Sequence, residues 1–285
     1  MWIERLPPHR PLLQDFIQRA AALNRESGNH WQPTPIHATS PGEPDLLLEP
    51  TSVPCKIVDE LVKKDYERQA MIYEAQYTDL FNLLREQTGH DNFSYLNISR
   101  INDIGKELIH NMTEKQPQWV FKRWREYDYR STLEITSELS QIQRNTLFNS
   151  IERAKAMGGY LLYNWLQNAE RVANGTMKNP EKMLLYSSHD GTLLALMNAM
   201  GVANGRETPY ASSFIMEIFD NETNYEIELL FRNDTTKPPY SLAVPGCEIP
   251  CTVEKMTNLF RNMVVTSYEA QQALCGIPAK SCNES

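Results

Sequence analysis

The segment at residues 183–201 constrains the fold more than any other part of the chain. A short apolar run ends in two serines, His189 and Asp190 follow, and an apolar helical pattern then runs to Gly201. A strand that leads directly into a helix is typical of α/β sheets, and a glycine just past the last periodic residue commonly ends a helix. Ligands of open α/β sheets bind beyond the carboxyl ends of strands, and helix N-termini favour anions. His189 and Asp190 are therefore candidates for a site that handles phosphate.

The residues alone leave two interpretations of this pair open. In the functional one, the His189 imidazole donates to phosphate oxygens and the Asp190 carboxyl supplies a proton. In the other, Asp190 is only the N-cap of the following helix and His189 is an ordinary loop residue. A strand followed by His-Asp and a helix does not decide between them.

The hydrophobic pattern of the rest of the chain places helices first and strands last. It predicts a charged amphipathic helix over residues 56–89 and further helical segments over 104–111, 118–127 and 141–168. It predicts an edge strand interrupted by prolines at residues 31–37, and strands at 183–187, 214–219, 225–232 and 241–245. This order indicates an α/β fold in which a sheet flanked by helices carries a helical insertion.

Composition excludes several classes of function. Lys plus Arg number 28 and Asp plus Glu 36, so the formal charge is −8 and there is no electrostatic basis for binding nucleic acid. No apolar run approaches the roughly 18 residues of a membrane span, so we expect none. We also expect no metal and no other cofactor, since a zinc site needs four ligands and Cys247 and Cys251 have no second pair nearby.

Sequons and cysteines favour an oxidising, glycosylating compartment. Chance from average composition would produce on the order of two or three N-x-S/T sites. Seven are present, at Asn92, Asn97, Asn111, Asn174, Asn221, Asn233 and Asn283. Cys247 and Cys251 flank a short loop-like stretch where a disulfide fits, and the total of five cysteines leaves one thiol unpaired. Met1 is followed by charge and prolines rather than a signal peptide, so we expect a truncated gene model or a mature fragment.

Several motifs resemble those of the histidine acid phosphatases of the prostatic and lysosomal type. W-Q-P-T-P-I-H at residues 31–37 resembles their W-Q-P-I-P-V-H strand, and Y-S-S-H-D-G-T at 186–192 is similar to their Y-S-A-H-D-T-T. The stretches at 155–159, 209–217, 231–235 and 242–247 follow in the family's order. The likeness covers about residues 31–275 and implies a histidine phosphatase-like α/β fold.

The resemblance also implies a chemistry and a set of residues. In the family, phosphate monoesters are hydrolysed through a phosphohistidine, a second histidine donates to the phosphate, and an aspartate protonates the leaving alcohol and then activates water. His189 and Asp190 match the last two roles, with His189 binding the substrate. The family further implies that Cys55 pairs with Cys275 rather than Cys282, and that Asn233 is glycosylated; we add Asn111 as a second glycan site. A secreted or lysosomal location and a homodimer are also implied.

The family's nucleophile motif, R-H-G-x-R-x-P, does not occur in this sequence. P-P-H-R-P at residues 7–11 lacks the glycine, and Arg130 falls in the helical insertion. We therefore expect a divergent segment at 1–30, a core edge strand plus helical cap insertion at 31–145, and the C-terminal part of the α/β core at 146–285, with the first core strand missing. Two hypotheses follow: an acid phosphatase whose nucleophile segment is absent from this chain, which is then inactive as given, or a catalytically inactive secreted binding protein.

Overall fold

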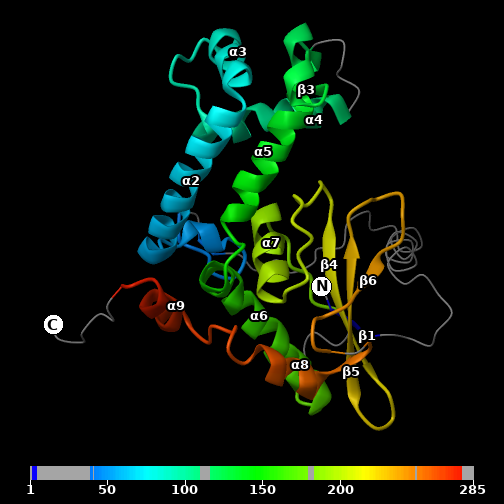
Figure 1. Cartoon of the computed structure of the whole chain (residues 1–285). Helices are drawn as coiled ribbons and strands as arrows, with labels where there is room; N and C mark the ends of the chain where they lie inside the picture. Colours follow the sequence, from blue (N-terminus) through cyan, green and yellow to red (C-terminus); the bar gives the residue numbers. More distant parts are fainter. Residues whose placement is uncertain are drawn as a thin grey trace, which may run out of the picture.

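The computed structural model describes residues 2–4, 39–40, 42–109, 116–178, 183–247 and 249–277. The expected edge strand at 31–37, the sequon at Asn111 and the thiol of Cys282 lie outside these residues, as does the P-P-H-R-P stretch. Figure 1 shows a sheet with its helices in the lower half of the view and a group of helices above them.

The sheet is built on the antiparallel hairpin of β4 (Ser213–Asp220) and β5 (Tyr225–Arg232). β5 also pairs antiparallel with β6 (Tyr240–Leu242) and with β7 (Cys251–Thr252). β1 (Trp2–Glu4) runs parallel to β4 on its other edge. Alternate residues of the central hairpin point to one face of the sheet, as a pleated strand requires, and there they enter the main hydrophobic core.

Helix α6 (Ile151–Ala173) packs against that buried face, and α7 (Asp190–Ala199) packs against α6. Glycine makes this helix pair possible, because a Cβ on Gly158 would lie 2.3 Å from the main-chain oxygen of Ala195. Gly201 adopts a φ of +67° just beyond α7, as a C-terminal glycine does. The position of α7, which begins at Asp190, is therefore fixed against α6.

Four further helices form a layer above the core, which we call the helical cap (Figure 1). It consists of α2 (Lys56–Gln76), α3 (Thr78–Thr88), α4 (Asn102–Ile109) and α5 (Thr132–Thr146). Shorter elements join them: η1 (Pro50–Ser52), η2 (Tyr95–Ile101), η4 (Gln118–Phe121), β2 (Arg123–Trp124), η5 (Arg125–Tyr127) and β3 (Arg130–Ser131). The cap has its own hydrophobic cluster, separate from that of the sheet.

A third cluster joins the cap to the core at the base of α2. It holds the disulfide between Cys55 and Cys275, which ties the start of α2 to the end of α9 (Tyr268–Leu274). A second disulfide joins Cys247 to Cys251, just before α8 (Val253–Phe260). Both pairs are those that the sequence analysis expects.

The arrangement confirms the predicted α/β class with helices around a sheet, but several predicted elements are wrong. The helix over 56–89 is two helices that break at Tyr77, whose side chain is buried in the cap cluster. Residues 118–127 are 3-10 turns and the strand β2, which pairs with β3 because Asp128 and Tyr129 take positive φ values of 55° and 56° and turn the chain back. The helix over 141–168 is interrupted at residues 147–150.

The predicted strand at 183–187 is extended but belongs to no ladder among the described residues. Leu184 and Tyr186 pack on the main core while Leu185 is 66% exposed.

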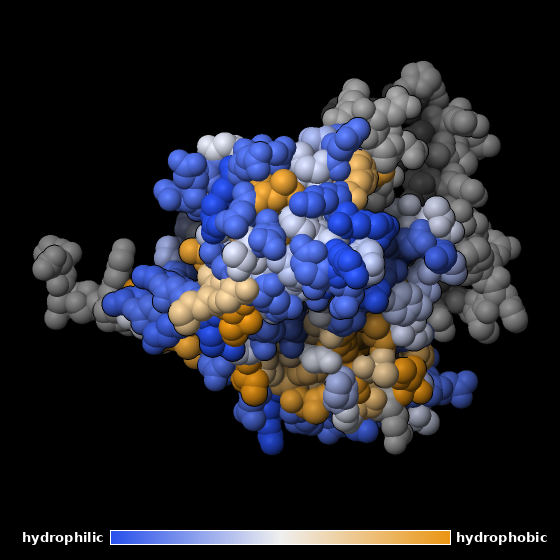
Figure 2. Space-filling view, turned by 45° about the horizontal axis from the view of Figure 1, so that its top comes forward, coloured by the Kyte–Doolittle hydropathy of each residue, from blue (hydrophilic) through white to orange (hydrophobic). Residues whose placement is uncertain are grey.

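Figure 2 shows hydrophilic side chains over most of one face, with apolar side chains gathered in its lower part. Of the helices in the described part of the chain, none has the length and apolar character needed to span a bilayer.

Candidate active site

His189 and Asp190 lie together where the extended segment enters α7. His189 is the N-cap, with φ −100° and ψ 161°, and its carbonyl oxygen accepts from the amides of Thr192 and Leu193 at 3.1 and 3.3 Å. Asp190 is the first helical residue, so it is not the N-cap. Both side chains are exposed, which leaves the imidazole and the carboxylate open to a ligand in solution.

Two hydroxyl groups anchor this helix start to the loop that precedes the cap. The Thr192 hydroxyl donates to the carbonyl oxygen of Leu48 at 2.6 Å. The Ser188 hydroxyl lies within hydrogen-bond distance of the same carbonyl and 2.8 Å from the Thr192 hydroxyl. Because Ser188 and Thr192 flank the pair, these contacts fix the backbone of His189 and Asp190 relative to the core.

The Asp190 carboxylate is held by Arg144, which lies in the last turn of α5 in the cap. Nε of Arg144 donates to Oδ2 at 3.1 Å and Nη2 donates to Oδ1 at 2.8 Å, so the contact is bidentate. A cation at a helix C-terminus and an anion at a helix N-terminus are both favoured by the helix dipoles. The side chains are 32% and 47% exposed, so solvent still reaches both groups.

Gly191 and Phe148 confine the guanidinium of Arg144. A Cβ on Gly191 would lie 2.9 Å from Nη2 of Arg144, so a side chain there would displace the group. On another side, Cζ of Arg144 lies 5.9 Å from the centroid of the Phe148 ring, which is fully buried. The position of Arg144 is thus set by the start of α7 as well as by its own helix.

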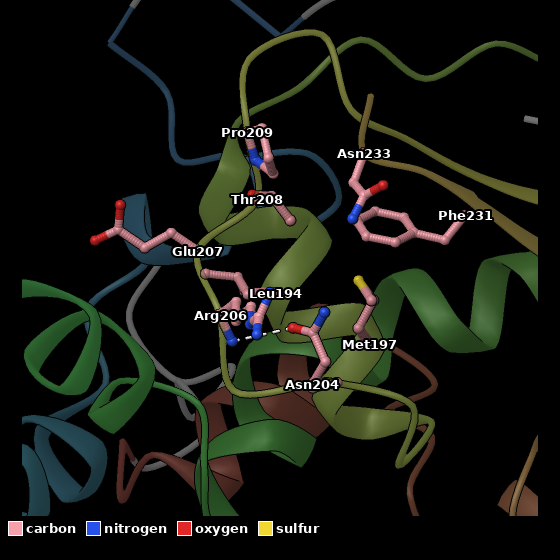
Figure 3. Close-up of a pocket in the computed structure, with 10 residues that line it drawn as sticks. Leu194, Met197, Asn204, Arg206, Glu207, Thr208, Pro209, Phe231 and Asn233 are labelled. Carbon is pink, nitrogen blue, oxygen red and sulfur yellow. Dashed lines mark hydrogen bonds between the residues drawn. The ribbon is translucent and has the colours of Figure 1, made fainter. Parts of the chain in front are cut away.

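A pocket lies along one face of α7 (Figure 3), and neither His189 nor Asp190 is among the residues that line it. Leu194 and Met197 follow Asp190 by four and seven residues, so they share its helix face and line the pocket. The Thr208 hydroxyl, from the opposite wall, lies 3.5 Å from the Asp190 carbonyl oxygen. The space between these walls is about 450 Å³, part of it open to solvent. Asn233 is exposed at the rim.

Arg144 is the residue that sequence reasoning missed. It lies 46 positions before Asp190, and no local pattern links two residues on separate helices at that distance. The predicted helix over 141–168 puts Arg144 near a helix start rather than in the last turn of α5, so the local pattern carried no signal for this role. No group of three or more His, Cys, Asp or Glu side chains that could hold a metal ion occurs within the described ranges.

Comparison with known proteins identifies the family. The model of the histidine phosphatase superfamily (branch 2) matches residues 46–232. Prostatic acid phosphatase of Rattus norvegicus is 32% identical over 232 residues, covering 80% of this chain and 58% of that protein. Lysosomal acid phosphatases of Xenopus laevis and Homo sapiens are each 29% identical, over 85% and 87% of this chain and 54% and 57% of theirs. The chain thus spans just over half the length of these relatives, and it belongs to the histidine phosphatase superfamily, branch 2.

Proposed function

We propose that the protein hydrolyses phosphate monoesters, with His189 and Asp190 as two of its working residues. The observation that carries this proposal is their exposed placement at the start of α7, where the backbone is pinned and the carboxylate is held away from the helix by Arg144. The likeness to proteins named acid phosphatases supports phosphate as the recognised group.

Each residue has a defined task in this proposal. The His189 imidazole donates to a phosphate oxygen, and the positive end of the α7 dipole adds to the attraction for the anion. The Asp190 carboxyl protonates the departing alcohol oxygen and, as a carboxylate, later takes a proton from the attacking water. The covalent step requires a histidine nucleophile. R-H-G-x-R-x-P does not occur in the 285 residues, so we assign no nucleophile to them and expect no turnover from them alone.

The absence of that motif from the sequence favours one other function. In it, the protein binds phosphate esters without cleaving them and acts as a secreted binding protein. The two functions differ in what the purified native protein does with a substrate, since a binder shows saturable phosphate binding and no release of alcohol.

The test is an assay of the protein purified from its natural source against nitrophenyl phosphate at mildly acidic pH. We expect turnover. We also expect that a phosphorylated histidine can be trapped during turnover, and that this histidine is not His189. In the recombinant form of the same native protein, His189→Ala should lower kcat/KM by a factor that corresponds to about 2–4 kcal/mol for all substrates. Asp190→Asn should lower kcat most for alkyl phosphates, whose leaving oxygen needs the proton. Phosphate binding without turnover would instead support the binding protein.

Independent features support the compartment that we propose. Two disulfides, exposed sequons such as Asn174 and Asn233, and relatives named lysosomal or prostatic acid phosphatases support a secreted or lysosomal protein. We propose a homodimer on the resemblance alone, and sedimentation of the purified protein tests it.

A further inference from the structure

The Asp190 carboxylate differs from the acidic side chains at three other helix starts in the described part of the chain, those of α5, α6 and α9. Glu134 at the start of α5 accepts from the main-chain amide of Ser131 in a capping box. Glu152 and Glu269 turn back onto their own amides at the starts of α6 and α9, and these hydrogen bonds hold their pKa values below the ordinary value. In each case the carboxylate accepts a hydrogen bond from a main-chain amide at the start of its own helix.

At α7 no described side chain caps the helix, although Asp190 stands in its first turn. A short carboxylate in that position can reach the first free amides and is attracted by the helix dipole. Here both of its oxygens are instead taken by the guanidinium of Arg144. Arg144 and the N-terminus of α7 are therefore alternative partners for the carboxylate, and in this structure the carboxylate binds Arg144.

A purely structural link between cap and core would be the simpler role for Arg144, but other contacts already make that link. Arg153 of α6 is buried and donates to the carboxylate of Asp65 on α2 and to the carbonyl oxygen of Thr146 at the end of α5. The Cys55–Cys275 disulfide and its cluster add to it. The Arg144 pair, by contrast, is partly exposed, and exposed ion pairs add little to stability.

We propose that Arg144 is the positioning residue of Asp190: it keeps the carboxyl group turned away from the amides of α7 and directed to the place where a leaving oxygen needs its proton. This role rests on the proposed function. It makes the cap a contributor to the chemistry of the core, since α5 supplies the side chain that orients the acid. A guanidinium is suited to this task because its planar fork fixes both oxygens, whereas an ammonium holds only one.

The first test needs no turnover. Amide hydrogen exchange is measured by NMR on the 285-residue chain with Arg144→Gln and with Arg144→Lys. The matched control is Arg130→Gln, because Arg130 is also a cap arginine paired with a carboxylate, that of Glu138, and is 31% exposed.

In Arg144→Gln the Asp190 carboxylate should return to α7, so the first amides of that helix should exchange several-fold more slowly while its other amides keep their rates. Arg144→Lys should lie between this variant and the wild type, and the control should leave α7 unchanged. Faster exchange along the whole of α7 together with a lower melting temperature would show a structural link and overturn the proposal. Unchanged exchange at the first amides would overturn it as well.

The second test uses the native protein with the same three variants and two substrates, nitrophenyl phosphate and glycerol phosphate. Arg144→Gln should lower kcat for glycerol phosphate at least about tenfold more than for nitrophenyl phosphate, with KM little changed. Arg144→Lys should recover part of the loss, and Arg130→Gln should match the wild type. An equal loss on both substrates would refute positioning. A wild type that cleaves neither substrate would refute the proposed function, while the exchange result would still decide where Arg144 directs the carboxylate.

Discussion

Replacing Asp65 by asparagine removes the one carboxylate that, within the described ranges, lies against the buried guanidinium of Arg153. Nη2 of Arg153 donates to Oδ2 of Asp65 at 2.5 Å, and Nη1 donates to the carbonyl oxygen of Thr146 at 2.7 Å. The Arg153 side chain is 4% exposed, and its Nε is buried without a hydrogen-bond partner among the described residues. The pair joins α2 of the cap to α6 of the core, and its Arg153 side is almost completely shielded from water.

The expected loss follows from this burial. Breaking a buried ion pair by removing one partner costs roughly 3–5 kcal/mol, because the remaining charge is left uncompensated. Asp65 is 31% exposed, and Arg153 keeps its contact with Thr146, so we take the lower end. We expect Asp65→Asn to lower the free energy of unfolding by about 3 kcal/mol. In a chain of this size that corresponds to a decrease of about 5 °C in the melting temperature.

The pH dependence gives the prediction a second readout. The hydrogen bond from Arg153, followed by desolvation in the opposite sense, leaves the pKa of Asp65 below its ordinary value of 3.8. A lowered pKa means that the stabilisation is complete above the unfolded-state pKa and is lost as the pH falls through the folded-state pKa. The stability difference between wild type and Asp65→Asn should be constant from neutral pH to about pH 5 and should shrink below about pH 4.

Urea unfolding with both disulfides oxidised measures these differences. The control is the double variant Asp65→Asn with Arg153→Met, in which an apolar side chain replaces the buried charge. It should recover stability to within about 1 kcal/mol of the wild type. A loss below about 1 kcal/mol for Asp65→Asn, or a double variant no more stable than the single one, would refute the reasoning.

Three further predictions address packing, covalent links and modification. Gly158→Ala should destabilise the protein by about 3 kcal/mol or more, because its Cβ would meet a main-chain oxygen of α7 at 2.3 Å. Its control is Gly105→Ala, whose Cβ would make only ordinary contacts, and which should be neutral or stabilising in the same unfolding assay. Replacing Cys55 and Cys275 together by serine should cost about 2–5 kcal/mol, since their disulfide closes a separation of 220 residues, and an unchanged urea midpoint would contradict this. Protein secreted from eukaryotic cells should lose mass on glycosidase treatment, and Asn233→Gln should remove one glycan on a gel; a mobility unaffected by either change would contradict a glycosylated Asn233.

The local sequence pattern was sufficient to predict an element wherever the residues of that element define it by themselves. The strands β4 and β5 are short runs rich in apolar residues, largely buried in the structure, and were predicted almost to their ends. Helix α7 was predicted from its apolar pattern and from Gly201, whose left-handed conformation is a property of that residue type. The start of a helix at His189 and Asp190 was predicted for the same reason, because the change from an extended apolar run to a helical pattern is recognisable within a few residues.

Elements whose ends depend on distant partners were not predictable. The break between α2 and α3 at Tyr77 places that ring in a cluster formed by η2 and α5, which no window around residue 77 contains. The β2–β3 hairpin turns through Asp128 and Tyr129, a pair without the glycine or asparagine that marks such turns in a sequence.

The contact between Arg144 and Asp190 shows the same division at the candidate site. The sequence by itself determined that a histidine and an aspartate begin a helix at the end of an apolar segment, because hydrophobic periodicity is a local property. Only the tertiary structure decided which way the carboxylate points. Its partner comes from a different helix of the cap, and the free energy of a bidentate pair depends on where two helix ends meet in space.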